Sequence, residues 1–239
     1  MKKKIMFLTL LLVALMATVS FAENETNEVI ADTSVNQVTE AEATTEFSGE
    51  NHIQFDYSNY GNFGDVPSNH WAIEYIYEAR NKGVINGYPN GTFAPENDVT
   101  VGEFIKMVAT TYFKSYNYVA PTDGSHWSMP YVNSLDRIVL NKDNYDYATL
   151  ERVITRAEAA RLLCMLHYRT HNVELDKTFS SVSNFADEAT ITDRTDRLAI
   201  DNCVKYGLIN GHAEDNTFRP LEGLTRCQAA KILMLTITR

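Results

Sequence analysis

The chain has 239 residues, and its 31 Asp and Glu outnumber its 21 Lys and Arg, which gives a formal net charge of -10. A hydrophobic content of 44% with 13 Tyr and 11 Phe is typical of a globular protein and excludes disorder along the whole length. The acidic balance argues against a nucleic-acid-binding protein, which needs a basic surface. Three cysteines are too few for a disulfide-based scaffold.

Residues 1–22 predict an export signal. Lysines occupy positions 2–4, residues 5–17 are apolar, and Ser20 and Ala22 are small residues of the kind that a signal peptidase reads. A membrane anchor is the alternative, but the apolar run is shorter than the roughly 20 residues of a spanning helix. We therefore expect a secreted protein that has no membrane span once the signal is removed.

Residues 23–59 predict an acidic, disordered spacer. Positions 23–50 hold eight acidic residues and no Lys or Arg. A segment of this composition buries too little apolar surface to offset the entropy lost on ordering. From residue 51 onward the chain holds 18 basic and 23 acidic residues, so the predicted folded part is only mildly acidic.

A threefold repeat fills the rest of the chain. Its clearest mark is the capping box, a Thr followed three residues later by Glu or Gln, which occurs as Thr100/Glu103, Thr155/Glu158 and Thr225/Gln228. In such a box the Thr hydroxyl and the Glu or Gln side chain each accept a hydrogen bond from backbone N–H groups of the first turn. We place the three units at 60–118, 119–181 and 182–239.

Each unit is predicted to consist of a helix, a loop and a second helix. In the first unit, residues 69–82 carry an apolar stripe at helical spacing, and Gly83 is expected to end the helix. The dipeptides Asn86-Gly87 and Asn90-Gly91 predict turns before the second helix, which starts after Thr100. A helix pair cannot bury its apolar face alone, so we expect a mainly α fold in which three units pack around a shared centre.

These motifs resemble the S-layer homology (SLH) domain, a family usually found as three tandem copies. The family pattern combines Phe-x-Asp, His/Trp-Ala, the loop Gly-Tyr-Pro-Asp-Gly-Thr-Phe-x-Pro and the sequence Ile-Thr-Arg-Ala-Glu. The matching positions are Phe63, Asp65, His70, Trp71 and 87–95 in the first unit, His126, Trp127 and 154–158 in the second, and Phe185, Asp187, Gly211, 217–220, Thr225 and Arg226 in the third. The resemblance covers about residues 60–239.

The resemblance implies a pseudo-threefold, three-pronged spindle with a central helical bundle, and noncovalent anchoring to the bacterial cell wall or S-layer. Family members bind secondary cell-wall polysaccharides, often through a pyruvylated sugar, in grooves between repeats. The Arg of Thr-Arg-Ala-Glu contacts the acidic group. The binding residues implied here are Arg156, Arg226, Trp71, Trp127, Gly87, Tyr88, Asn90, Gly91, Gly211 and His212. No cofactor and no metal are expected.

The position of the two arginines gives an independent reason for this ligand. Arg156 and Arg226 each follow the capping Thr, where the first backbone N–H groups of a helix lack an intrahelical acceptor. A guanidinium beside the positive end of the helix dipole favours a carboxylate. The alternative is a surface salt bridge, which contributes little. The Gly-rich loop is expected to bring bare backbone near the ligand, and for Trp71 and Trp127 we favour core packing over stacking on a sugar.

Three departures from the family pattern limit the number of grooves. Val101 stands where the first unit would carry the Arg, and the second unit lacks the Gly-rich loop. The third unit has Thr195 at the Trp position, and its Gln228 replaces the Glu but can still complete a capping box. If each groove uses parts of two neighbouring units, we expect two functional sites or fewer.

The cysteines and paired histidines give weaker signals. Cys203 and Cys227 lie on the two helices of the third unit, and we favour buried free thiols over a disulfide between them. Cys164 is predicted to lie in the core. His167 and His171 are one helical turn apart, but with no third ligand identified we favour a solvated helix end over a zinc site.

The favoured interpretation is a wall-binding protein that is not an enzyme. The sequence carries no nucleophile elbow, phosphate loop or His-Glu-x-x-His motif. One alternative is a surface adaptor whose degenerate triplet binds a protein partner, and the acidic spacer is a candidate contact for a surface protein. A cell-wall hydrolase is disfavoured, because no further region is left for a catalytic domain.

Overall fold

Three Thr residues open the helices at the centre of the fold. Helices α2 (Val101–Phe113), α5 (Arg156–His171) and α7 (Arg226–Thr238) each begin directly after one of them. In all three, the Thr hydroxyl accepts from the N–H of the third helical residue, and the side chain of that residue accepts from the N–H of the Thr. The three capping boxes that the sequence predicts are therefore confirmed.

The capping boxes of α2 and α7 differ in one residue and in geometry. In α2, the Glu103 carboxylate accepts from the N–H of Thr100 at 2.9 Å, and the N–H of Glu103 donates to the Thr100 hydroxyl at 3.2 Å. In α7, the amide oxygen of Gln228 accepts from the N–H of Thr225 at 3.2 Å, and the N–H of Gln228 donates to the Thr225 hydroxyl at 3.5 Å. Gln228 thus completes the box in place of Glu, as predicted, but with longer bonds, since a neutral amide is a weaker acceptor than a carboxylate.

The capping box of α5 has a contact that the sequence did not predict. The Glu158 carboxylate accepts from the N–H of Thr155 at 3.0 Å and also pairs with the guanidinium of Arg152. Burial raises the pKa of Glu158, but the hydrogen bonds from Arg152 and Thr155 outweigh it and lower the pKa overall. The carboxylate therefore stays ionised while it caps the helix.

The computed structural model describes residues 63–114, 116–177 and 184–239. The predicted export signal and acidic spacer lie outside these ranges, and the described residues all belong to one compact unit. The described residues are mainly helical and contain no extended β-strand, as the sequence predicts. The remaining elements are α1 (Ile73–Asn81), α3 (Met129–Leu135), η2 (Lys142–Asn144), α4 (Tyr147–Glu151), η3 (Glu188–Thr190) and α6 (Arg194–Lys205).

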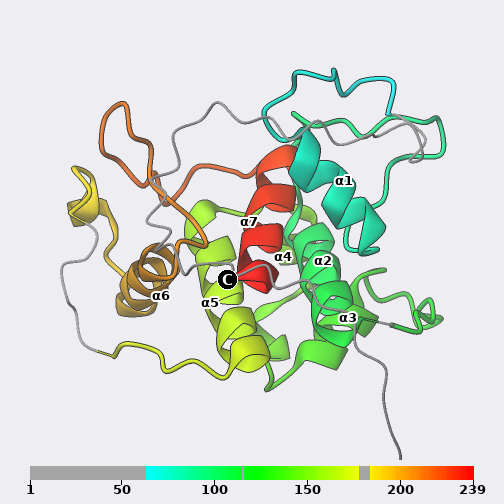
Figure 1. Cartoon of the computed structure of the whole chain (residues 1–239). Helices are drawn as coiled ribbons and strands as arrows, with labels where there is room; N and C mark the ends of the chain where they lie inside the picture. The colour runs from blue at the N-terminus through cyan, green and yellow to red at the C-terminus, as the bar shows by residue number, and fades with distance from the viewer. Residues whose placement is uncertain (1–62, 115, 178–183) are drawn as a thin grey trace, which may run out of the picture. The chain divides into compact units, whose positions relative to one another are not determined.

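The helices pack in a cyclic order. Helices α2, α5 and α7 contact one another, and each also carries the first helix of the following unit. Thus α3 packs on α2, α6 packs on α5, and α1 packs on α7 (Figure 1). Each interface between units is therefore built from the second helix of one unit and the first helix of the next.

Backbone hydrogen bonds close a ring at the start of the central helices. The N–H of Val99 donates to the carbonyl of Leu224 at 2.9 Å, and the N–H of Leu224 donates to the carbonyl of Ile154 at 3.3 Å. The N–H of Ile154 completes the ring by donating to the carbonyl of Val99 at 3.0 Å. All three residues are buried, so these bonds satisfy backbone groups that water does not reach.

The predicted boundaries of the first helix are only partly right. The helix begins at Ile73 rather than near residue 69, and it ends before Gly83, which has a positive φ of 67°. Ile76 and Ala79 are fully buried, as the apolar stripe predicts. Residues 64–72 instead form turns that bring Asp65 to the loop of the same unit.

An aspartate holds the loop in the first and third units. The Asp65 carboxylate accepts from the N–H groups of Phe93 and Ala94 at 2.8 and 2.6 Å. The Asp187 carboxylate accepts from Phe218 and Arg219 at 2.8 and 2.7 Å. The second unit differs, because η2 and α4 occupy the place of the Gly-rich loop and make this unit more than a helix, loop and helix.

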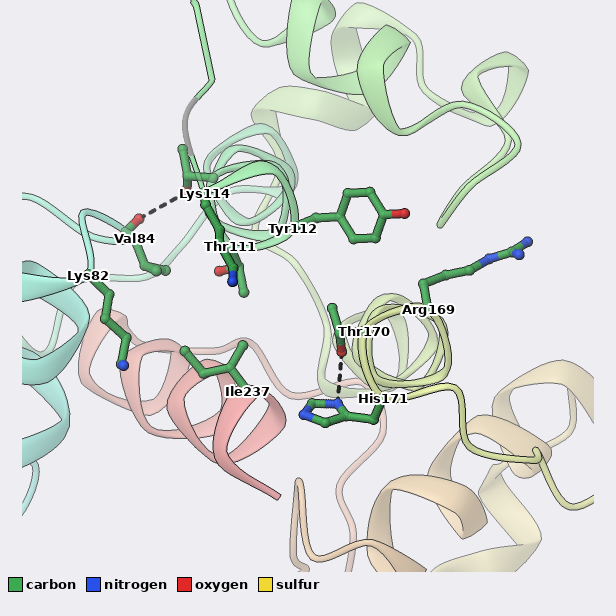
Figure 2. A pocket seen from close by; sticks show the side chains of 10 residues that line it. Lys82, Val84, Thr111, Tyr112, Lys114, Arg169, Thr170, His171 and Ile237 are labelled. Carbon is green, nitrogen blue, oxygen red and sulfur yellow. Dashed lines mark hydrogen bonds between the residues drawn. The ribbon is translucent and has the colours of Figure 1, made fainter. Parts of the chain in front are cut away.

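At the other end of the central helices lies a cavity of about 620 Å³ (Figure 2). Its walls come from the last turns of α2, α5 and α7 and from the segment after α1. Across the residues described, no helix combines the length and the apolar character needed to cross a membrane.

Candidate ligand-binding interfaces

Arg226 joins the third unit to the loop of the first. Its Nε donates to the carbonyl of Phe93 at 2.9 Å, and its Nη2 donates to the carbonyl of Asn86 at 3.0 Å. The guanidinium carbon lies 4.8 Å from the ring centre of Tyr88 and 4.9 Å from that of Phe93. With 5% of its surface exposed, Arg226 is a buried part of this interface.

Arg156 makes the same contacts between the second unit and the loop of the third. Its Nε donates to the carbonyl of Phe218 at 2.8 Å, and its Nη2 donates to that of Asn210 at 2.9 Å. The guanidinium carbon lies 4.9 Å from the Phe218 ring centre. Burial lowers the pKa of Arg156, while the nearby Glu222 and Asp187 act in the opposite direction.

The expectation that these arginines stand at open helix ends is wrong. The N–H of Arg156 donates to Glu222 O at 2.9 Å, and the N–H of Arg226 donates to Asn97 O at 2.9 Å. The next N–H of each helix also donates to a carbonyl of the neighbouring unit, at Pro220 and Pro95. Neither the predicted vacant helix terminus nor the surface salt bridge is found, because the arginines and the helix ends hold the units together.

Glu103 and Gln228, the third residues of α2 and α7, act as helix caps and not as candidate ligand contacts. Their side chains are turned back onto the N–H groups of Thr100 and Thr225. The acceptor oxygens are thereby engaged within their own helix ends. These residues position the start of α2 and α7, as the sequence predicts, and we assign them no part in ligand binding.

Two departures from the family pattern prove to belong to one interface. By the cyclic order, the residue after Thr100 should reach the loop of the second unit. That residue is Val101, which is 2% exposed, and the second unit lacks the Gly-rich loop. A cavity of about 610 Å³ lies there, lined by Val101 and Tyr145 among others. The missing arginine and the missing loop are therefore the two sides of the same lost contact.

The loop glycines serve packing within their own units. A Cβ on Gly87 would lie 2.1 Å from Cε1 of Phe63, and one on Gly211 would lie 2.2 Å from Cε1 of Phe185. These glycines thus admit an aromatic ring, which corrects the expectation that they expose backbone to a ligand. Gly91, with φ of 82° and an open surrounding, is the turn glycine.

The residues between these glycines differ in exposure. Asn90 Oδ1 accepts from the N–H and hydroxyl of Thr92 and so stabilises the turn. Tyr88 is 40% exposed and covers the Arg226 guanidinium. His212, its counterpart in the third unit, lies 3.3 Å from Glu214.

The two tryptophans are on the surface, so the predicted core packing is wrong. Trp71 is 54% exposed and Trp127 is 37% exposed. Lys231 of α7 places its ammonium 5.6 Å from the ring centre of Trp71, and the His70 ring stacks beside the same indole at 5.8 Å. An aromatic face and a cation of a neighbouring unit are thereby brought together.

Lys231 was not expected from the sequence, although a periodic signal points to it. Five residues after the first residue of each central helix stands a basic side chain: Lys106, Arg161 or Lys231. On α5 this residue is Arg161, whose Nε lies 2.9 Å from Oδ1 of Asp196 in the third unit. Since Thr195 replaces the tryptophan there, the cation of this interface faces a carboxylate instead of an indole.

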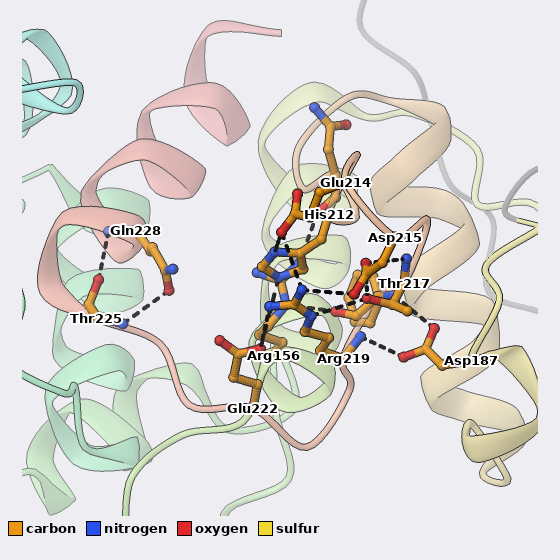
Figure 3. Close-up of polar contacts among 12 residues, drawn as sticks. Arg156, Asp187, His212, Glu214, Asp215, Thr217, Arg219, Glu222, Thr225 and Gln228 are labelled. Carbon is orange, nitrogen blue, oxygen red and sulfur yellow. Dashed lines mark hydrogen bonds and ion pairs between the residues drawn. The ribbon is translucent and has the colours of Figure 1, made fainter.

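The loop of the third unit has acids at three positions where the first has none, although the first carries Glu96 and Asp98 elsewhere. Arg219 forms ion pairs with Glu214, Asp215 and Glu222 within 3.6 Å (Figure 3). Hydrogen bonds from Thr217 and Arg219 lower the pKa of Asp215 to about 2. Aligned on the shared turn at Thr92 and Thr217, the first unit has Pro89, Asn90 and Asn97 at the positions of the three acids.

The histidine of each His-Trp pair is held by a glutamate of its own unit. His126 Nε2 lies 2.8 Å from Glu151, and His70 Nε2 lies 3.5 Å from Glu96. His70, Glu96 and Cys227 bring three potential metal ligands within 4.8 Å of one another. Because His70 Nδ1 accepts from the N–H of Ala72, the proton of the neutral ring sits on Nε2, where a metal would have to bind. This cluster is thus better suited to a hydrogen bond than to a metal.

The cysteines are free and buried. Cys203 donates to Ala160 O of α5 at 3.3 Å, which places it against the helix of Cys164. Cys227 instead lies 3.8 Å from Glu96. His167 is 1% exposed, with its ring centre 4.6 Å from that of His171, so the predicted solvated helix end is wrong for His167.

Comparison with known proteins finds a family match within the first unit. Residues 62–105 match the family model of the S-layer homology domain. An endoglucanase of Bacillus sp. (strain KSM-635) is 25% identical over 189 residues, which cover 74% of this chain and 19% of the relative. An uncharacterised cell wall amidase of Bacillus anthracis is 29% identical over 101 residues, which cover 40% of this chain and 19% of the relative.

A further relative is cell surface glycoprotein 1 of Acetivibrio thermocellus, 39% identical over 46 residues that cover 19% of this chain and 2% of the relative. This chain spans less than a fifth of the length of these relatives, with shares of 19%, 19% and 2%. The surface-protein relatives and the domain match point to the cell surface or cell wall. Residues 62–105 are therefore similar to an S-layer homology domain.

Proposed function

We propose that this protein is a noncatalytic anchor that binds an acidic, pyruvylated secondary polysaccharide of the bacterial cell wall. The observation that carries the proposal is the exposed Trp71, which lies within the matched S-layer homology segment and faces Lys231 of α7. An indole face suits the apolar face of a sugar ring, and an ammonium suits a carboxylate.

We further propose that all three units are SLH repeats arranged as a pseudo-threefold spindle. The cyclic packing of first helices on second helices supports this arrangement. The closed hydrogen-bond ring of Val99, Leu224 and Ile154 supports it as well, because each residue occupies the same place relative to its capping Thr.

Among the three interfaces, the one between α7 and the first unit suits an acidic sugar best. It combines Trp71, Lys231 and a loop without acids at the positions of Glu214, Asp215 and Glu222. At the α5 interface Asp196 pairs with Arg161 and so reduces the positive charge that a carboxylate would meet. The α2 interface lacks both the arginine and the loop, although it keeps Trp127. We therefore propose one main groove.

The names of the relatives do not make this chain a hydrolase. The endoglucanase and the amidase share only 19% of their length with it. We propose that the shared part serves attachment to the wall, and that this chain has no catalytic role.

The proposal is tested by co-sedimentation of the secreted protein with purified cell walls. Walls stripped of secondary polysaccharide are compared with intact walls, and Trp71→Ala with Lys231→Gln is the groove variant. We expect the variant to weaken binding at least about tenfold, as for the loss of one charge-assisted contact and an aromatic surface. The matched control is Trp127→Ala with Lys106→Gln, which should bind intact walls nearly as the wild type does.

Arg226 and Arg156 are poor probes of this site, because their removal also breaks the interfaces between units. Wild-type binding that persists on stripped walls would contradict the proposed ligand and favour a protein partner. Equal binding by the groove variant and the wild type would contradict the proposed groove.

A further inference from the structure

Basic side chains gather around the cavity at the C-terminal ends of the central helices. Among the residues that the structure describes, its lining includes Lys82, Lys114, Arg169 and His171 and contains no Asp or Glu. In a chain with 31 acidic and 21 basic residues, such a grouping without a carboxylate is unusual. Figure 2 shows the two lysines on one side of the cavity and Arg169 and His171 on the other.

Most of this charge is not neutralised by neighbouring side chains. Within the part of the chain that the structure describes, Lys114, Arg169 and His171 form no ion pair with a carboxylate, while Lys82 pairs with Glu78 at 3.6 Å. Arg169 donates through Nε to the carbonyl of Ile138 at 2.9 Å, which leaves the Nη groups for another acceptor.

Helix dipoles account for part of the arrangement only. Lys82 is the C-cap of α1, Lys114 is the C-cap of α2, and Arg169 and His171 lie in the last turn of α5, so each basic residue stands at the negative end of a helix. That effect needs no shared cavity. It does not explain why cations from three helices line one hollow of about 620 Å³, a size common for small-molecule sites.

We propose that this cavity binds a ligand that carries more than one phosphate group. A phosphate offers several acceptor oxygens and up to two negative charges, which suits a guanidinium and an ammonium. Because the cations lie on two sides of the cavity, one phosphate contacts the lysines and another contacts Arg169 and His171. Tyr112 and Ile237 add an apolar wall, which suits a ligand whose phosphate groups are joined through carbon.

The His171 ring is already oriented for this role. Its Nδ1 lies 2.8 Å from the hydroxyl of Thr170, which itself lies 2.9 Å from the carbonyl of Leu166 (Figure 2 shows the first contact). Nε2 is then the ring nitrogen left for a ligand. The site differs from the Trp71 groove, because neither Trp71 nor Lys231 lines it, and along α7 Lys231 stands six residues, roughly 9 Å, before Ile237 of the cavity.

Isothermal titration calorimetry of the secreted protein tests the proposal, with tripolyphosphate and a glycerol-phosphate oligomer as probes. We expect saturable binding that weakens with salt. Lys114→Gln with Arg169→Gln should weaken it at least about tenfold. The control variant, Arg137→Gln with Lys142→Gln, removes the same charge outside the cavity and should stay within about twofold.

The two probes separate the possible sources of the phosphate groups. Binding of the oligomer indicates a phosphodiester polymer, whereas binding of tripolyphosphate alone indicates a soluble oligophosphate, and both support the site. Absence of saturable binding to either probe, or equal weakening by the cavity and control variants, would overturn it. The groove variant, Trp71→Ala with Lys231→Gln, should still bind tripolyphosphate. Such binding would show that the phosphate site does not depend on the proposed wall-binding groove.

Discussion

Replacing Arg226 by Met isolates the role of the buried guanidinium. Methionine keeps much of the apolar stem but removes the hydrogen bonds to Phe93 O and Asn86 O, at 2.9 and 3.0 Å. A hydrogen bond from a charged donor contributes about 1.5–3 kcal/mol. The contacts with the Tyr88 and Phe93 rings add about 1 kcal/mol.

With two such hydrogen bonds and the ring contacts, we expect Arg226→Met to lower the free energy of unfolding by about 4–7 kcal/mol, a large share of the stability of an ordinary domain. Arg226→Lys should cost less, because it keeps the charge but loses the forked donor geometry. Lys231→Met, a surface change on the same helix, is the control and should cost no more than about 1 kcal/mol.

Urea denaturation followed by far-ultraviolet circular dichroism measures these changes, and an unchanged m-value shows that the variants unfold in the same way. If Arg226→Met and Lys231→Met fell within about 1 kcal/mol of each other, the guanidinium would not hold the loop of the first unit. The structural role assigned to the arginine would then be refuted.

Three further predictions concern packing, thiols and pH. Gly87→Ala should lower the free energy of unfolding by about 1–3 kcal/mol in urea denaturation, because the new Cβ would lie 2.1 Å from Phe63 Cε1. The control, Gly64→Ala, places its Cβ where nothing lies within 4 Å and should leave stability nearly unchanged. Equal effects of the two substitutions would contradict the packing argument. Burial raises the pKa of Cys203 and Cys227, so Ellman's reagent should label both slowly in the native protein and all three cysteines after unfolding, and a native disulfide would contradict this. Burial lowers the pKa of His167, whose ring faces Thr236 O, His171 and Tyr206, so the unfolded chain takes up the proton first as the pH falls. Stability should therefore decrease as the pH falls through about 6.5 toward the lower folded-state pKa, and by less in His167→Phe; equal urea-midpoint changes in both proteins would refute this.

Local patterns determined where the central helices begin. A capping box is a short-range device, since the Thr and the Glu or Gln are three residues apart and satisfy N–H groups of the same turn. Glu103, Glu158 and Gln228 were therefore readable from the sequence as capping residues, and the structure confirms each of them. Gly83 at the end of α1 and the turn at Asn90 were readable in the same way. The mainly helical class followed from these signals.

The roles of the arginines and tryptophans were decided only by the tertiary structure. Arg226 lies 140 residues from Asn86 and 133 residues from Phe93 in sequence, and nothing local indicates that it is buried there. The same holds for Trp71, which looks like core by composition yet is 54% exposed beside Lys231. Burial depends on which unit packs against which, and the cyclic order of the helices sets that.

The sequence by itself determined that three capped helices recur, that the chain resembles the S-layer homology family, and that the charge of -10 is unevenly spread. The tertiary structure decided that the arginine of one unit serves the loop of the next. Consequently Val101 and the missing loop of the second unit form one departure rather than two. The physical reason is that a buried guanidinium needs carbonyl acceptors, and those acceptors lie in another part of the chain.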